Sequence, residues 1–316
     1  MADNKPIATL ALNPAIDLSY LVSELVPFRK TKAKNARYDA GGNAINVSRA
    51  LKKLHKEAHT CCILGGESGA MLKHLLALEG IIPESISVEG ETRINSTIQQ
   101  RRPPTEFKIS GIAPANISSA EITTITRRFL KLAGDGYGVL TGSVPPGIAP
   151  DMYAKLAAQL RDQGAKVVLD TKDDMLISAL ESKPFLIKPN VYELEITSGK
   201  ALPNVEAIAD QARQLQRGGV ANVCVSMGAD GAVLVNDEDS YYAPAPKIRV
   251  MCSVGAGDAM VGGLLAGLVD GLPAEDVLLQ GLACGSGAVT QPGTMLFDPE
   301  QLDALKEGLE VTKLGI

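Results

Sequence analysis

A glycine-rich segment near the carboxyl end of the chain has the strongest chemical pattern. Val254 is followed by Gly255, Ala256, Gly257 and Asp258, and then by an apolar run typical of a helix. Glycines permit a tight turn and close approach of a ligand, and free N–H groups at a helix start bind anions. A carboxylate beside such a site can accept the proton of a hydroxyl that attacks a phosphoryl group. The segment therefore predicts Asp258 as general base and 255–257 as an anion hole, although an Asp is also common at any helix start.

Three further segments could contribute ligand-binding groups. Residues 41–46 offer glycine backbone and Asn43 and Asn46 amides to a polyol. Residues 188–193 place Asn190 and Glu193 three apart, so they share a face if a helix begins there and could hold hydrated Mg²⁺. The glycine-bounded segment 226–231 could line an adenine or phosphate cleft. The alternatives are a strand-to-helix turn, a helix-capping Asn and a hairpin turn.

Basic residues are grouped in two regions of an otherwise acidic chain. Such groups could bind a phosphate, and the alternative is a solvated charged surface. The two groups are Arg29, Lys30, Lys32, Lys34 and Arg37, and Arg93, Arg101 and Arg102.

Several common nucleotide motifs are missing. The sequence has no GxxxxGK[ST], and the segment at 255 lacks the third glycine of GxGxxG. The protein-kinase signatures are also absent. If ATP binds, it does so without a P-loop, a Rossmann fingerprint or a protein-kinase cleft.

The composition argues against several classes of partner and indicates the cellular compartment. The net charge of −5, the lack of Trp and the 4% content of aromatic residues argue against nucleic-acid or membrane-surface partners. Five cysteines without a CxxC pair suit free thiols in a reducing compartment. The first residues lack the pattern of a signal peptide, and no apolar stretch is long enough to span a bilayer. We therefore expect a cytoplasmic protein.

The elements that must position these residues alternate along the chain. Amphipathic helices are expected at 118–133, where Ser118 and Glu121 form a capping box, at 150–162 and at 205–216. Short apolar runs between them favour buried parallel strands. This alternation predicts an α/β fold with a doubly wound, mostly parallel sheet. The candidate strands are 7–12, 60–64, 138–141, 166–170, 185–188, 222–226 and 232–235.

Two segments interrupt the alternation. Residues 14–39 and 88–111 are polar and basic, and the second alternates polar and apolar residues, which is typical of strands. We expect them to form a small β-sheet lid, with a pair of surface loops as the alternative. Residues 1–316 would then be a single domain with this lid.

In this order along the chain, the motifs resemble those of the ribokinase/phosphofructokinase-B family of carbohydrate kinases. Residues 41–46 are similar to its N-terminal signature and 253–258 to its C-terminal signature, and the resemblance runs from about residue 7 to 305. Residues 12–17, 91–95 and 142–147 are similar to the branch that acts on phosphosugars. The resemblance implies a ribokinase-like fold, ATP and Mg²⁺ as cofactors, and a homodimer formed through the lid.

The resemblance also assigns roles to residues. It implies that sugar hydroxyls are held by Asp17, Gly41, Gly42, Asn43 and Asn46, and the existing phosphate by Lys30, Arg93 and Ser143. It implies that ATP faces Lys188, Asn190, Ser226, Gly228 and Gly231, that Glu193 orients Mg²⁺ through water, and that Gly255, Ala256, Gly257 and Asp258 are catalytic. Some members of the family bind K⁺, and the comparable positions here are Cys252, Val254, Ala288, Gln291 and Gly293.

The sequence leaves the substrate open. Asn43 stands where many 1-phosphofructokinases and tagatose-6-phosphate kinases have Lys, which favours fructose 6-phosphate, whereas residues 92–95 favour 1-phosphofructokinase. We expect ATP-dependent phosphorylation of fructose 6-phosphate first, with fructose 1-phosphate and tagatose 6-phosphate as alternatives. A non-catalytic sugar-phosphate sensor is the alternative of another class. A dehydrogenase is disfavoured because the GxGxxG motif is missing.

Overall fold

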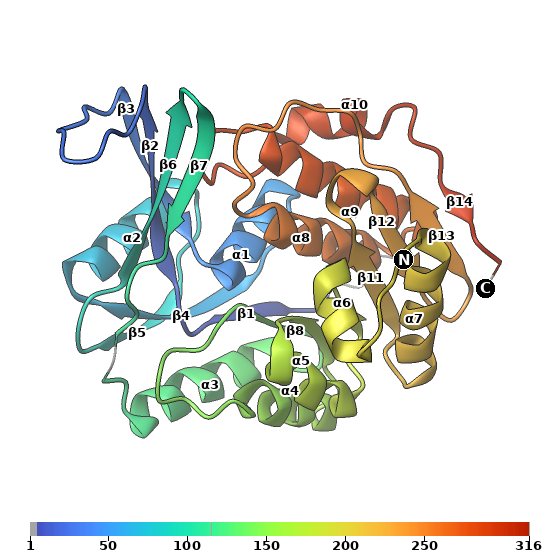
Figure 1. The fold of residues 1–316 in the computed structure, drawn as a ribbon. Coiled ribbons are helices and arrows are strands. Elements are labelled where there is room, and N and C mark those ends of the chain that lie inside the picture. The colour runs from blue at the N-terminus through green and yellow to red at the C-terminus, as the bar shows by residue number, and fades with distance from the viewer. Residues whose placement is uncertain (1–4, 115, 316) are drawn as a thin grey trace.

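Two β-sheets form the framework of the chain in the computed structural model, which describes residues 5–114 and 116–315 (Figure 1). The strand order of the larger sheet is β14-β13-β12-β11-β10-β9-β8-β1-β4-β5. Neighbours from β11 to β5 run parallel, and β12 to β14 are antiparallel. The strands are β1 (Ile7–Ala11), β4 (His59–Gly65), β5 (Glu84–Val88), β8 (Tyr137–Thr141), β9 (Lys166–Asp170), β10 (Leu186–Ile187), β11 (Asn222–Ser226), β12 (Ala232–Val235), β13 (Ser240–Ala243) and β14 (Thr312–Lys313).

The first strand lies inside the sheet, between β8 and β4. The chain therefore winds outward from β1 in both directions, which defines a doubly wound sheet. Every residue of β1 and β8 is buried, because helices cover both faces. The predicted α/β fold is confirmed.

Helices pack on both faces of the sheet. One face is covered by α3, α4 and α7, through side chains such as Phe129, Leu156 and Ile208. The other face is covered by α1, α8 and α9, through Val47 and Val261 among others (Figure 1). The helices are α1 (Asn43–Lys53), α2 (Gly66–Leu78), α3 (Ser119–Ala133), α4 (Met152–Asp162), α5 (Asp173–Ala179), α6 (Val191–Ser198), α7 (Val205–Arg217), α8 (Ala256–Asp270), α9 (Ala274–Val289) and α10 (Leu302–Lys306).

The predicted helix boundaries have a local physical basis. Ser118 Oγ accepts the Glu121 N–H at 3.2 Å, and a Glu121 carboxylate oxygen accepts the Ser118 N–H at 2.7 Å, so the capping box at the start of α3 is present. Helix α4 begins at Met152 rather than Pro150, because Pro150 and Asp151 form a turn before it.

The second sheet is formed by the two segments predicted as a lid. Its strand order is β3-β2-β6-β7. Asp17 in β2 lies beside Asp39 in β3 and Asn95 in β6, and all three side chains share the sheet face directed at the larger domain body. The strands are β2 (Ala15–Val22), β3 (Asn35–Gly41), β6 (Arg93–Arg101) and β7 (Pro104–Ile109).

The lid is bound to the rest of the chain through the loop after α9. Thr294 donates from its backbone N–H to Asp39 at 3.0 Å and from its hydroxyl to Asp17 at 2.9 Å. Lys108 in β7 donates to Ser253 Oγ at 2.6 Å, just before α8. The lid therefore contacts both loops that flank the helix pair α8 and α9.

Among the described residues, none of the helices combines the length and the apolar character needed to cross a bilayer.

The helices α1 and α8 lie unusually close together. A Cβ atom placed on Gly262 in α8 would lie 2.5 Å from the Cβ of Ala50 in α1, which is closer than two such atoms can approach. Gly262 therefore permits the separation at which these two helices pack.

We predict that Gly262→Ala pushes α1 and α8 apart. Overpacking costs about 1–3 kcal/mol, whereas Ala favours a helix interior by about 1 kcal/mol over Gly, so we expect a net loss of up to about 2 kcal/mol. Urea unfolding measures the loss of stability, and kcat measures whether the displaced helices disturb activity. The double variant Ala50→Gly/Gly262→Ala restores the space and should recover kcat; parental values in the single variant would contradict the prediction.

Candidate active site

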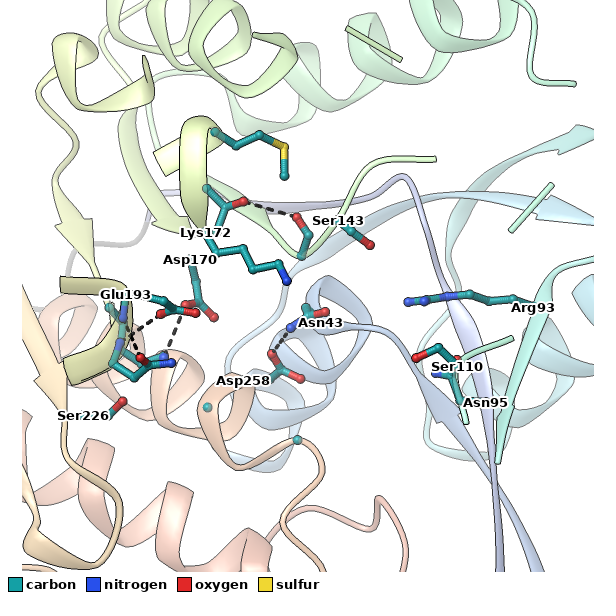
Figure 2. Close-up of a pocket in the computed structure, with 17 residues that line it drawn as sticks. Asn43, Arg93, Asn95, Ser110, Ser143, Asp170, Lys172, Glu193, Ser226 and Asp258 are labelled. Atoms are coloured by element: carbon teal, nitrogen blue, oxygen red, sulfur yellow. Dashed lines mark hydrogen bonds and ion pairs between the residues drawn. The ribbon is translucent and has the colours of Figure 1, made fainter. Parts of the chain in front are cut away.

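Asp258 is the buried carboxylate at the start of α8. One of its oxygens accepts a hydrogen bond from Asn43 Nδ2 at 2.9 Å (Figure 2). The other accepts from Asn46 Nδ2, also at 2.9 Å. Both asparagines lie in the first turns of α1. The close packing of α1 against α8 thus brings the two predicted signature segments together around one carboxylate.

The surroundings of Asp258 favour a proton acceptor that works near neutral pH. Burial, followed by repulsion from Asp170, raises the pKa of Asp258 to about 7, against the lowering effects of Asn46, Asn43 and Lys188. A carboxylate with such a pKa holds a proton more strongly than an exposed one and is still ionised in part at pH 7. This suits a general base.

The start of α8 has the geometry of an anion site. Gly255, the residue before the helix, has a φ of 82°, a left-handed conformation that favours glycine. The N–H groups of the first turn lack partners inside the helix. Lys188 adds positive charge beside this turn. Its ammonium nitrogen lies next to Gly257, 3.4 Å from the position that a Cβ atom there would take. The three features together can bind a phosphoryl group.

Lys188 is paired with Asp170 at the end of β9. Their charged atoms lie 3.3 Å apart, and both side chains are largely buried. Burial on its own would lower the pKa of Lys188, but attraction to Asp170 and Glu193 outweighs it and the pKa is raised. The ammonium group therefore stays charged.

Asn190 and Glu193 form a capping box at the start of α6. Asn190 Oδ1 accepts the Glu193 N–H and Glu193 Oε2 accepts the Asn190 N–H, each at 2.9 Å. The capping interpretation is thus correct, and it leaves the Mg²⁺ interpretation open because Glu193 also lines the cavity beside Asp170. Burial raises the pKa of the Glu193 carboxyl. Two carboxylates completed by waters fit Mg²⁺.

A cavity of about 600 Å³ brings together ten of the predicted residues (Figure 2). At its far side from Asp258, Arg93 in β6 donates to the backbone oxygen of Asn13 at 3.0 Å, and its buried Nε has no hydrogen-bond partner among the described residues. That unused donor suits an anionic ligand. Predicted residues in the lining are Asn43, Arg93, Ser143, Lys188, Asn190, Glu193, Ser226, Gly255, Gly257 and Asp258.

The sequence analysis missed several residues of this cavity. Asp170 was predicted only as the last residue of a strand, although ligands of open α/β sheets bind at the carboxyl ends of strands. That rule could have identified Asp170 and the two residues after it. The additional lining residues are Asn95, Ser110, Gly142, Asp170, Thr171, Lys172 and Met175.

Other predicted residues lie outside the lining. Asp17 is held behind it by Asn95, which donates to the Asp17 carboxylate at 2.8 Å. Gly41 leaves room for that carboxylate, since a Cβ there would lie 2.3 Å from an Asp17 oxygen. Asn46 is buried behind Asp258, and Lys30 is exposed in the loop between β2 and β3. Gly42 begins α1.

A second cavity of about 690 Å³ adjoins the first, and the two share Ser226 and Gly257. Gly228, Gly231 and Ala256 line it as well. The rest of its wall is mostly aliphatic: Ala245, Pro246, Ile248, Val250, Met260, Leu282 and Val289. A planar apolar group can enter here while its polar end reaches the first cavity.

Four of the residues predicted for K⁺ lie in the loops before α8 and after α9, and Ala288 lies in the last turn of α9. The Cys252 N–H donates to the Val289 carbonyl at 3.3 Å, and the Ala288 carbonyl accepts the Gln291 N–H at 3.2 Å. Val254 and Gly293 are in the same two loops. In the described part of the chain no three His, Cys, Asp or Glu side chains gather as metal ligands. K⁺ binding through carbonyls stays a prediction.

Known proteins resemble this chain over nearly its whole length. The profile described as "pfkB family carbohydrate kinase" matches residues 10–301. The 1-phosphofructokinase of Bacillus subtilis is 36% identical over 98% of this chain and 100% of its own length. That of Vibrio cholerae is 33% identical over 98% of both.

A solved structure shows the same fold. Phosphofructokinase-2 of Escherichia coli in complex with substrates and products has a TM-score of 0.91 and 27% identity, over 95% of this chain and 98% of that chain. The same enzyme has been solved with fructose 6-phosphate, with potassium and as a tetrameric inhibited form.

Together with the buried Asp258 carboxylate beside a helix start and the cavity that joins it to Arg93, these matches show an enzyme that transfers a phosphoryl group to an alcohol: the chain belongs to the pfkB family of carbohydrate kinases, in its phosphofructokinase branch.

Proposed function

We propose that the chain transfers the γ-phosphoryl group of ATP to fructose 1-phosphate, giving fructose 1,6-bisphosphate. The observation that carries the proposal is the single cavity with Asp258 at one side and the unused Arg93 donor at the other, which suits a sugar with a hydroxyl near one end and a phosphate near the other. The relatives with the higher identities are 1-phosphofructokinases, at 36% and 33%.

Fructose 6-phosphate is the second candidate. The sequence analysis placed it first because of Asn43, and the relatives reverse that order. It stays a candidate because phosphofructokinase-2 of Escherichia coli, solved with fructose 6-phosphate, has a TM-score of 0.89 at 26% identity. Tagatose 6-phosphate is the third candidate.

Different residues of the two cavities hold different parts of the nucleotide and its metal ion. The aliphatic cavity holds the adenine, and Lys188 with the first turn of α8 holds the phosphates. Glu193 and Asp170 would hold hydrated Mg²⁺, which would offset charge on the phosphates. These assignments fit the residues present, and K⁺ at the loops of Cys252 and Gly293 is part of the same proposal.

Proton transfer is the step assigned to Asp258. The acceptor oxygen attacks the γ-phosphorus, the bond to the β-phosphate oxygen breaks, and ADP leaves. Asp258 takes the proton of the attacking hydroxyl. Arg93 and Ser143 hold the existing phosphate, which keeps the hydroxyl near Asp258. The lid excludes water, so that water does not replace the sugar hydroxyl as acceptor of the phosphoryl group.

We further propose that the outer face of the lid binds a second copy of the chain, so that the kinase domain of residues 1–316 works as a dimer. The pairing of the strands puts Tyr38, Ile94, Phe107 and Ile109 on the face opposite to Asp17 and Asn95. All four are exposed, at 41% to 58%. An apolar face of this kind favours a protein partner, and a like face of a second copy can cover it.

The proposed activity is tested by measuring ADP release with Mg-ATP and, in parallel, fructose 1-phosphate, fructose 6-phosphate, tagatose 6-phosphate and fructose. We expect the highest kcat/KM with fructose 1-phosphate. A higher value with fructose 6-phosphate would select the second candidate. Binding of the phosphosugars without turnover would support a sensor and overturn the proposal.

Asp258→Asn should lower kcat by at least ~100-fold while KM changes little, since it removes the base but keeps the shape. In the parent enzyme, protonation of Asp258 removes the base, so kcat/KM should fall as the pH drops through about 7. A pH series of kcat/KM measures this. Circular dichroism checks that the variant is folded, and near-parental turnover would refute the assignment.

Arg93→Ala should raise KM for the phosphosugar and leave KM for ATP nearly unchanged, because it removes a phosphate donor on the sugar side only. Arg101→Ala is the matched control, since Arg101 ends the same strand β6 but is exposed. Equal KM values in the Arg93 variant and the parent would remove Arg93 from the phosphate site.

Phe107→Glu should separate the proposed dimer, because it puts a charge into an apolar interface. Sedimentation velocity would show a dimer for the parent and a monomer for the variant. Lys155→Glu on the exposed side of α4 is a control that should stay dimeric. A monomeric parent would contradict the proposed interface.

A further inference from the structure

Arg49 is a fully buried arginine that the proposed reaction does not use. It lies in α1, three residues after Asn46, with 1% of its surface exposed. Two of its nitrogens donate to the Glu79 carboxylate, each at 2.7 Å. The third, Nη1, donates to the Ala40 and Thr294 carbonyls at 2.7 Å and to Asn46 Oδ1 at 3.1 Å. Arg49 thus contacts α2, the base of the lid, the loop after α9 and one partner of Asp258.

The contact with Asn46 determines which way that amide faces. The Asn46 oxygen accepts from Arg49, and its NH₂ group donates to Asp258 at 2.9 Å. A rotated amide would put NH₂ against the guanidinium and oxygen against the carboxylate. Both contacts would be repulsive, because the guanidinium only donates and the carboxylate only accepts. The guanidinium therefore allows one orientation.

We propose that Arg49 is a positioning residue of the kinase: it locks the Asn46 amide so that its NH₂ group stays on Asp258 and keeps that carboxylate ready to accept the proton. The proposal rests on the proposed role of Asp258 as the base. Arg49 touches neither cavity and acts through Asn46 alone. Glu79 in turn holds the guanidinium in place by two parallel hydrogen bonds.

The orientation of the Asn46 amide affects the pKa of Asp258 and therefore the pH at which this residue can accept a proton. The groups that face it are Asn43 and Asn46 from α1, Asp170 from the end of β9 and Lys188 after β10, with Glu193 of α6 acting on Lys188. Asn46 is one of the donors that favour the ionised form. An unlocked amide would lose that hydrogen bond part of the time, which raises the pKa of Asp258.

The test compares the pH dependence of kcat/KM in four variants. Arg49→Lys keeps the charge but lacks the planar fork of the guanidinium. We expect the acidic limb of the pH profile, where kcat/KM falls as the pH drops, to shift to higher pH by about 0.5–1 unit. The activity then falls roughly 3- to 10-fold at pH 6.5 and less than about 2-fold at pH 9. Asn46→Ala should move the limb in the same direction. Arg49→Lys in the Asn46→Ala background should add no further shift, since the two residues act as one unit.

Glu79→Gln is the matched control. It weakens the ion pair with Arg49, but the Ala40 and Thr294 carbonyls still hold Nη1 beside Asn46, so it should lower Tm without moving the acidic limb. If Arg49→Lys is recovered unfolded, Arg49→Gln is measured in its place, because its amide reaches toward the same carbonyls.

An unmoved limb in the folded Arg49 variant, or a shift that adds to that of Asn46→Ala, would overturn the proposal. So would a shift in Glu79→Gln as large as that of Arg49→Lys. These results differ from a failure of the proposed function, which would appear as an active Asp258→Asn enzyme.

Discussion

The arrangement depends on keeping a carboxylate buried at the start of a helix and still able to ionise. Burial alone favours the protonated form of Asp258, and the nearby Asp170 adds to this effect. Two amide donors from α1 and the buried Lys188 act in the opposite direction. These opposing effects leave the pKa of Asp258 at about 7. The close contact of α1 with α8 keeps the two amides within hydrogen-bond distance of the carboxylate.

The lid is connected to this balance through one loop. Thr294 binds Asp17 and Asp39 of the lid through its hydroxyl and N–H, and its carbonyl accepts from Arg49. The same guanidinium binds Asn46 and the lid residue Ala40. Asp258, the lid strands and the loop after α9 are thus linked by one set of hydrogen bonds, in which an unpaired buried group would be costly. The fold couples the position of the lid to the surroundings of Asp258.

The sequence predicted the elements that carry strong local signals. Apolar runs identified the central strands, and the Ser118 capping box identified the start of α3. It did not predict β5 and β14, the short strands at the two edges of the larger sheet, or β13, the four-residue strand beside β14. In the site, paired motifs identified Asp258 and Asn43, whereas Asp170 was missed because one Asp at a strand end has no motif. The role of Arg49 could not be predicted, because its acceptors come from β3, α2 and the loop at 294.

The substrate was harder to predict than the chemistry for a physical reason. Fructose 1-phosphate and fructose 6-phosphate both present a phosphate at one end and a primary hydroxyl at the other, so Asp258 and Arg93 suit either. Selection must come from the ring between these ends, where Asn43, Asn95 and Ser110 line the cavity. Asn95 is held on both sides, because it donates to Asp17 at 2.8 Å and accepts the Gly111 N–H at 3.1 Å. A side chain fixed in this way discriminates between ring hydroxyls by geometry, since a misplaced hydroxyl leaves a polar group unpaired. In the proposed reaction, the two ends of the cavity would therefore carry out the transfer, and its middle, where Asn95 is fixed, would select the sugar.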